Sequence, residues 1–171
     1  EEMKPLASKP HAFLDEINQG LYRIFSQVHT SIFVTSCYLV ADILERKVVY
    51  ANAGHPPPVL LRRSENRLLH LSALNDDPDI ALGLAGDVDY TLQEIQVFKG
   101  DSLILYTDGA FEAQNPNGEQ VGMKRFNEWI LQNGDQPMPE LLGNLMQSLE
   151  DYCGTNEFGD DVCLFGMDFV R

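Results

Sequence analysis

Hydrophobic residues follow two different spacings along the chain, and the spacing changes near residue 32. Between residues 13 and 25 they recur at helical intervals, with Asp15, Glu16 and Gln19 on the other side. That period predicts an amphipathic helix. Further along, short runs rich in Val, Ile, Phe, Tyr and Leu alternate with turn residues, which is typical of strands. The pattern predicts strands at residues 32–42, 48–53, 59–62, 68–71, 90–98 and 102–106.

The last third of the chain returns to helical spacing. A short apolar face follows Gly122 and includes Phe126 and Ile130, and a longer one covers residues 141–152. A final strand is predicted at residues 161–170. This order of helix, strands, two helices and strand indicates an α+β domain with helices packed on antiparallel sheets. Because no repeat or linker divides the chain, we expect one domain over residues 1–171.

Charge and composition narrow the classes of function. The net charge of −14, without a strong cluster of Lys or Arg, argues against nucleic-acid binding, because phosphate backbones repel an acidic surface. The apolar stretch at residues 31–44 is too short for a membrane span. No signal-peptide pattern is visible, and Cys37, Cys153 and Cys163 form no zinc motif. We therefore expect a cytoplasmic protein with reduced thiols.

Two acidic motifs lie where predicted strands end or begin. Asp108 follows the apolar run at residues 103–106 and precedes Gly109, whereas Asp160 and Asp161 open the final predicted strand. Adjacent strand residues point to opposite faces, so only one of the latter pair would face any given site. Converging carboxylates would repel each other unless a divalent cation lay between them. Asp-Gly and Gly-Asp-Asp are also common turns, so the residues alone leave both interpretations open.

One segment near residue 55 resembles the signature of a known family. Ala51-Asn52-Ala53-Gly54-His55-Pro56-Pro57-Pro58 closely resembles a signature of the bacterial PPM phosphatases of the SpoIIE and RsbU kind. The resemblance covers nearly the whole chain. Further segments match in the same order: residues 13–25, Ile32-Phe33-Val34-Thr35, Leu82-Gly83-Leu84, residues 103–119 and Asp160-Asp161-Val162-Cys163-Leu164.

This resemblance implies an α-β-β-α sandwich of antiparallel sheets flanked by helices. It also implies a serine/threonine phosphatase in which two Mn²⁺ or Mg²⁺ ions activate a water molecule against a phosphoserine or phosphothreonine. Matched by motif, Asp108 and Asp160 would be metal ligands, Asp161 would support the site and Gly109 would keep the turn tight. Asn52, Gly54 and His55 belong to the signature, and we interpret His55 as a structural residue held by hydrogen bonds, not as a base.

One family motif has no counterpart in the chain. The resembling family carries an upstream GDxxGHG segment with a further metal ligand, and no such segment occurs in these 171 residues. Either the sequence is part of a longer protein, or the protein is shorter than its relatives. Without that segment we expect weak metal binding, because affinity depends on the number of ligands. We also expect uncovered sheet edges, which favour pairing with another chain as a homodimer.

The family resemblance further implies partners. They are a phosphorylated regulatory protein, typically an anti-anti-sigma factor of the STAS fold, and a sensor or receiver domain fused to the phosphatase. An alternative is a catalytically incomplete domain that docks a regulatory partner without turnover. Retention of both Asp108 and Asp160 favours the enzyme, whereas the missing motif favours the docking module. An unrelated α+β domain is the third hypothesis, and it predicts no response to Mn²⁺.

Overall fold

The structure is a computed structural model that describes residues 6–28, 32–71 and 80–170. These residues divide into two units. Unit 1 contains the described residues up to Pro57 and those from residue 80 to Val97, and unit 2 contains Pro58–Leu71 and residues 98–170. The interpretation of the chain as one domain stays a prediction.

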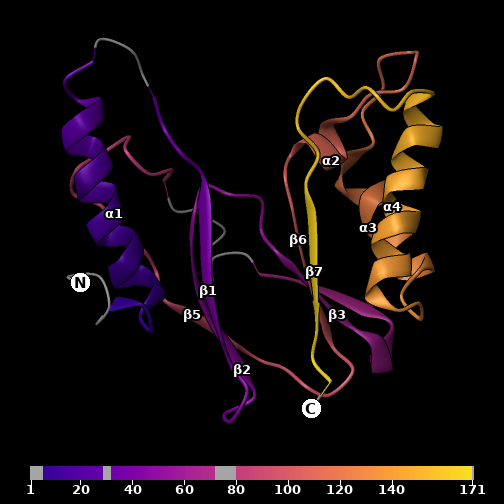
Figure 1. Cartoon of the computed structure of the whole chain (residues 1–171), viewed down its shortest axis with the longest axis horizontal. Helices are drawn as coiled ribbons and strands as arrows, with labels where there is room; N and C mark the ends of the chain where they lie inside the picture. Colours follow the sequence, from indigo (N-terminus) through magenta and orange to yellow (C-terminus); the bar gives the residue numbers. More distant parts are fainter. Residues whose placement is uncertain (1–5, 29–31, 72–79, 171) are drawn as a thin grey trace. The chain divides into compact units, whose positions relative to one another are not determined.

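Unit 1 combines one helix with a three-stranded antiparallel sheet. Helix α1 spans Pro10–Phe25, and the sheet has the order β1-β2-β5, with β1 at Ser36–Asp42, β2 at Lys47–Ala53 and β5 at Gln93–Gln96 (Figure 1). Proline is well tolerated at the start of a helix because its missing N–H has no partner there. The unit buries one cluster of apolar side chains from the helix, β2 and the segment before β5: Leu14, Ala51, Ala53, Leu82 and Tyr90.

A fully buried amide side chain fastens α1 to the loop before β5. Asn18 Nδ2 donates to the Ala85 carbonyl at 2.8 Å, and Asn18 Oδ1 accepts from the Gly83 backbone N–H at 2.8 Å. Gly83 has a φ of +84°, and a Cβ there would lie 2.4 Å from a ring carbon of Phe25. Glycine at this position therefore permits both the turn and the close approach of the helix.

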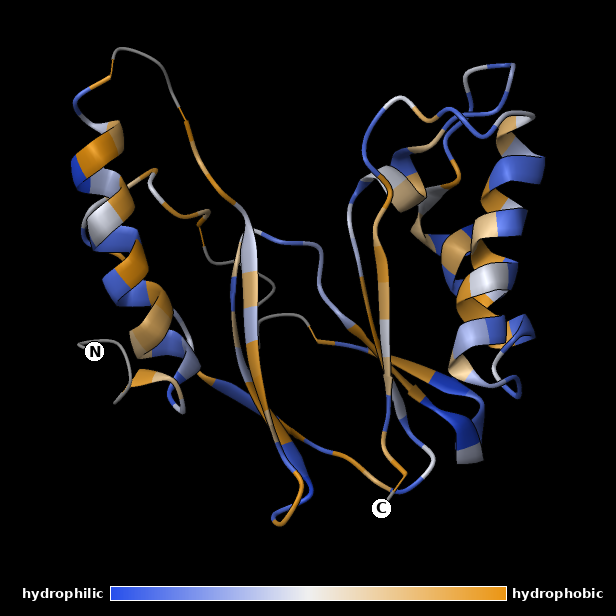
Figure 2. Ribbon diagram, viewed as in Figure 1, coloured by the Kyte–Doolittle hydropathy of each residue, from blue (hydrophilic) through white to orange (hydrophobic). Residues whose placement is uncertain are grey.

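Unit 2 contains a four-stranded antiparallel sheet and three helices. The sheet order is β4-β3-β6-β7, and the elements are β3 (Val59–Arg62), β4 (Arg67–His70), β6 (Ser102–Tyr106), β7 (Leu164–Asp168), α2 (Gly109–Glu112), α3 (Gly122–Gln132) and α4 (Met138–Cys153). A short 3-10 turn, Arg63–Glu65, connects β3 and β4. Figure 2 shows hydrophobic and hydrophilic residues alternating along α4, and its buried residues recur at helical spacing: Leu141, Leu145, Leu149 and Cys153.

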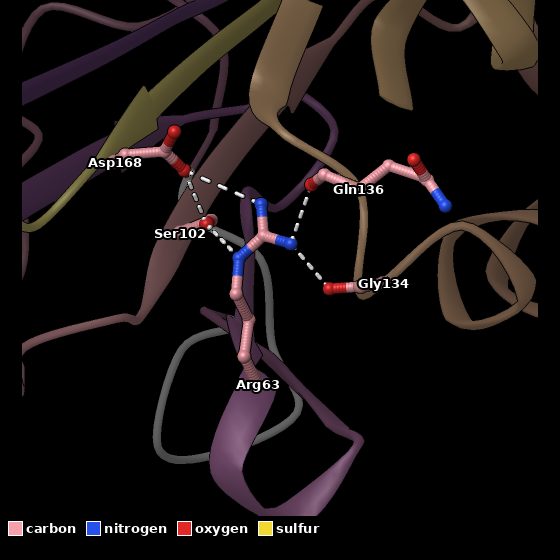
Figure 3. Close-up of polar contacts among 5 residues, drawn as sticks. All are labelled: Arg63, Ser102, Gly134, Gln136 and Asp168. Carbon is pink, nitrogen blue, oxygen red and sulfur yellow. Dashed lines mark hydrogen bonds and ion pairs between the residues drawn. The ribbon is translucent and has the colours of Figure 1, made fainter. Parts of the chain in front are cut away.

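Arg63 joins the sheet of unit 2 to the connection between α3 and α4 (Figure 3). Its Nε donates to Ser102 Oγ at 2.9 Å, and its Nη1 donates to the carbonyl oxygens of Gly134 and Gln136, the latter at 2.7 Å. The same guanidinium pairs with Asp168, whose carboxylate also accepts from Ser102 Oγ at 2.6 Å. These contacts connect one guanidinium group to β6, to β7 and to the α3–α4 connection, so the network holds that connection against the two strands.

The predicted α+β class, with two antiparallel sheets and flanking helices, is confirmed. Several boundaries were wrong. The strand expected at residues 32–42 begins at Ser36, since Val34 makes only an isolated bridge to Leu82. The strand expected at residues 90–98 is reduced to β5, which pairs with the first part of β2. None of the described helices is both long and apolar enough to cross a membrane.

The final strand was expected at residues 161–170 but occupies only Leu164–Asp168. Its ladder with β6 stops at Leu164. One residue earlier, the Cys163 N–H donates to the side chain of Thr107, at 2.9 Å from Oγ1, and not to a backbone carbonyl of β6. Asp160 and Asp161 therefore lie in the preceding loop. The argument that neighbouring strand residues point to opposite faces was wrong for this pair, because a loop has no such alternation.

Candidate metal site

Asp108 is positioned by the end of a buried strand and the start of a helix. Strand β6 is almost entirely buried, and the chain leaves it through Thr107 into α2. Asp108 caps this helix: its Oδ1 accepts from the Gly109 N–H at 3.1 Å, and its carbonyl accepts from the Glu112 N–H at 2.9 Å. An aspartate at this position satisfies an N–H that the helix itself leaves free. The carboxylate is exposed at the end of the sheet.

The loop before β7 is held against the end of β6 by one threonine. Thr107 Oγ1 donates to the Asp161 carbonyl at 2.7 Å and accepts from the Cys163 N–H at 2.9 Å, while the Thr107 N–H donates to the Cys163 carbonyl at 3.1 Å. The Asp160 carboxylate accepts from the Asp161 N–H at 2.7 Å. These bonds place the backbone of the loop directly beside the turn that follows β6.

Gly109 makes this approach possible. A Cβ on Gly109 would lie 2.6 Å from the Asp161 carbonyl oxygen and 3.4 Å from that of Asp160. Any residue with a side chain would therefore push the two segments apart, because the first distance is far inside van der Waals contact. Tertiary packing thus requires a glycine at this position, which leaves room for the opposite backbone, and the part of Gly109 in a metal site stays a prediction.

The donor chemistry of this site suits a hard divalent cation. Asp108 and Asp160 are both exposed, and among the described residues neither forms an ion pair with a Lys or Arg. Oxygen ligands of this kind suit Mg²⁺ and Mn²⁺, and Mg²⁺ is often held by one or two carboxylates together with water. Within the part of the chain that the structure describes, no three acidic, His or Cys side chains converge on one ion. The chemistry of Asp108 and Asp160 thus fits a divalent cation, and among the described residues these two carboxylates are the candidate ligands.

Asn52, Gly54 and His55 of the signature segment lie in unit 1, at the end of β2 and in the turn that follows it. Asn52 Oδ1 accepts from the His55 N–H at 2.9 Å, and Asn52 Nδ2 donates to the His55 carbonyl at 2.7 Å. Gly54 has a φ of +69°, and a Cβ there would meet Ala81 Cβ at 3.1 Å. His55 Nδ1 lies 3.4 Å from Thr35 Oγ1. The Asn52 side chain thus closes the turn by bonding both backbone polar groups of His55. The structural role of the three signature residues stays a prediction.

Sequence reasoning missed Thr107 as the residue that joins the two acidic segments. Its hydroxyl bonds residues 54 and 56 positions away, Asp161 and Cys163. Threonine just before an aspartate carries no local signal for such a role, because both partners are remote in sequence. It also missed α2, which is a single turn and too short for a helical period to appear.

Comparison with known proteins identifies the family. The family model described as "Stage II sporulation protein E (SpoIIE)" matches residues 1–170. The phosphoserine phosphatase RsbU of Bacillus subtilis is 26% identical over 140 residues, which is 80% of this chain and 41% of RsbU. RsbP, a phosphoserine phosphatase of the same organism, is 23% identical over 160 residues, 93% of this chain and 37% of RsbP. The chain thus spans about two fifths of the length of these relatives.

Solved structures show the same fold. The SiaA-PP2C domain of Pseudomonas aeruginosa superposes with a TM-score of 0.78 at 23% identity, covering 94% of this chain and 61% of that domain. At this identity the likeness establishes the fold alone. The family match over residues 1–170 goes further, and the chain belongs to the SpoIIE family of PPM-type phosphatase domains.

Proposed function

We propose that this chain is part of a metal-dependent protein serine/threonine phosphatase of bacterial signalling, and that Asp108 and Asp160 bind its Mn²⁺ or Mg²⁺. The observation that carries the proposal is the direct packing of the turn at Gly109 against the loop at Asp160 and Asp161, in a member of this family. Relatives of this chain bear the name phosphoserine phosphatase, which supports the reaction class.

The residues of this chain would contribute binding and orientation. When bound, the metal supplies a water of lowered pKa and stabilises negative charge on the phosphoryl group. Asp108 and Asp160 would hold the cation, each with one oxygen already oriented by a backbone N–H. Thr107 would keep the two carboxylate-bearing segments together through its bonds to Asp161 and Cys163. Asp161 would support the site through its backbone.

The proposal includes a class of substrate, which we base on the family. We expect a phosphoserine or phosphothreonine on a regulatory protein, of the anti-anti-sigma type with a STAS fold. Support comes from RsbU and RsbP, both phosphoserine phosphatases to which this chain is similar. Association of the chain as a homodimer stays a prediction that sedimentation would test.

The deciding experiment measures Mn²⁺-dependent hydrolysis of p-nitrophenyl phosphate by this chain, by Asp108→Asn and by the control Asp151→Asn. Asp151 is an exposed carboxylate on α4, so its replacement changes the net charge equally. Loss of a ligand should reduce activity by about a hundredfold or more, with the control unchanged. Mn²⁺ titration calorimetry on the same proteins gives a second readout that does not need turnover. Equal activity or equal Mn²⁺ affinity in Asp108→Asn would refute the assigned role.

A second function, docking of a regulatory partner without turnover, is favoured by one observation. Within the described residues the candidate site offers two carboxylates and no third convergent ligand. The same experiment separates the two functions. A chain that neither hydrolyses p-nitrophenyl phosphate nor binds Mn²⁺ would refute the enzyme and leave docking as the remaining proposal, whereas hydrolysis that Asp108→Asn abolishes would support the enzyme.

A further inference from the structure

A cavity of about 430 Å³ lies next to the candidate metal site in unit 2. Its wall includes Gly109 and Asp160, so it opens beside the carboxylate assigned to the metal. The remaining wall comes from the end of α2, the connection between α2 and α3, the end of α4 and the loop between α4 and Asp160. Cavities of several hundred Å³ with a few polar groups are typical of ligand sites.

The interior and the rim of this cavity differ in chemistry. Cys153 is buried and Phe158 packs against the main hydrophobic cluster of unit 2, which makes part of the wall apolar. Glu112 and Glu157 contribute carboxylates in addition to Asp160, and all three are exposed. The lining contains no Lys, Arg or His, and among the described residues no ion pair involves Glu112 or Glu157. The cavity therefore carries negative charge that the chain itself does not compensate.

Glu112 and Glu157 do not complete a three-ligand metal site together with Asp160. Across the described ranges 6–28, 32–71 and 80–170, no group of three acidic, His or Cys side chains is close enough to hold one. Glu112 comes from the end of α2 and Glu157 from the loop after α4, so the two carboxylates reach the cavity from different segments. A larger cation with an apolar stem fits that arrangement, since Arg and Lys side chains bury their methylene groups against apolar surface and keep the charged end among polar groups.

The position of the cavity indicates where such a cation comes from. A phosphoserine that binds the cation held by Asp108 and Asp160 would lie beside this cavity together with its neighbouring residues, because Gly109 and Asp160 line the cavity. A chain of net charge −14 repels a phosphorylated acidic segment, whereas a cationic residue beside the phosphoserine would be attracted to Glu112 and Glu157. The cavity would then select substrates by the residues that flank the phosphate.

On the basis of the proposed function, we propose that this cavity is a specificity subsite that binds an arginine or lysine side chain next to the phosphoserine of the protein substrate. Glu112 and Glu157 provide the charge that recognises it, and Cys153 and Phe158 provide the apolar contact for its stem. Neither glutamate is among the residues assigned to the metal.

The test uses phosphoserine peptides with alanine flanks in which a single arginine is moved through the positions on either side of the phosphoserine. The chain is assayed with Mn²⁺, and kcat/KM for each arginine peptide is divided by that for the all-alanine peptide. We expect at least one position with a ratio of about ten, which two exposed carboxylates acting together can supply. Glu112→Gln and Glu157→Gln should each bring that ratio towards one, and added salt should lower it in the unmodified chain.

The matched control is Glu128→Gln, which removes one exposed carboxylate from α3 outside the cavity lining. It should keep the arginine preference. Absence of any preference, or an equal loss in Glu128→Gln, would overturn the subsite, because the effect would then reflect net charge. If the chain hydrolyses no peptide and no p-nitrophenyl phosphate, the proposed function fails, and the same peptides are compared by fluorescence anisotropy. Arginine-dependent binding that Glu112→Gln and Glu157→Gln remove would still support the subsite, and equal binding would overturn it.

Discussion

Gly109→Ala tests the contact that brings the two acidic segments together. The added Cβ would lie 2.6 Å from the Asp161 carbonyl oxygen and 3.1 Å from the carbonyl carbon. Both atoms belong to the backbone, so no side-chain rotation can relieve the overlap. Overpacking of this kind costs about 1–3 kcal/mol, and the better helix propensity of alanine returns at most about 1 kcal/mol in the single-turn α2. We therefore expect the free energy of unfolding to fall by about 1–2 kcal/mol.

Gly143→Ala is the matched control, with an expected effect of opposite sign. Gly143 lies inside α4, and apart from the helix backbone no atom of the described residues would come within 4 Å of its new Cβ. Alanine should stabilise this helix by about 0.5–1 kcal/mol, because glycine loses more conformational freedom on folding.

Urea unfolding followed by circular dichroism measures both variants, and thermal unfolding should show a decrease of about 3–6 °C for Gly109→Ala. Mn²⁺ titration calorimetry adds a local readout, since separation of the two segments should also weaken metal binding. A Gly109→Ala protein as stable as the unmodified chain would refute the close packing at Asp161. Destabilisation by Gly143→Ala of similar size would show that the loss is a general effect of replacing glycine.

Two further predictions concern unit 1 and the cysteines. Asn18→Ala should lower the free energy of unfolding by about 2 kcal/mol, because it removes bonds to Ala85 and Gly83 and leaves a buried backbone N–H without an acceptor; an unchanged urea midpoint would contradict this. Iodoacetamide at mildly alkaline pH should label exposed Cys163 before Cys37, since burial raises the pKa of the Cys37 thiol to about 12 and thereby keeps it protonated until the pH approaches that value. Peptide mass spectrometry compares the two rates, and equal labelling would refute the burial of Cys37.

Local patterns predicted most of the elements because their signals lie within a few neighbouring residues. The helix expected at residues 13–25 is observed as Pro10–Phe25, and the strand expected at residues 102–106 is observed with the same bounds. Amphipathic period and β-branched content act over one element, so a single sequence displays them. The same reasoning drew attention to Asp108 and Asp160, since each follows or precedes a recognisable strand.

Long-range contacts decided what the local patterns left open. The final strand is shorter than expected because the Thr107 side chain takes the bond of the Cys163 N–H. That choice depends on residues 56 positions apart, and no local propensity encodes it. The cavity beside Asp160 is likewise lined by residues of α2 and of the end of α4. These two elements lie close together only in the folded unit.

The sequence alone therefore determined the family, the α+β class and the two acidic segments, because motifs and hydrophobic periods are local properties of the chain. Only the tertiary structure decided that Gly109 must leave room for the Asp161 carbonyl, that Thr107 ties the loop to β6, and that Glu112 lies on the wall of a cavity beside Asp160. The physical reason is that close packing and hydrogen bonding act between atoms that are near in space, whatever their separation along the chain.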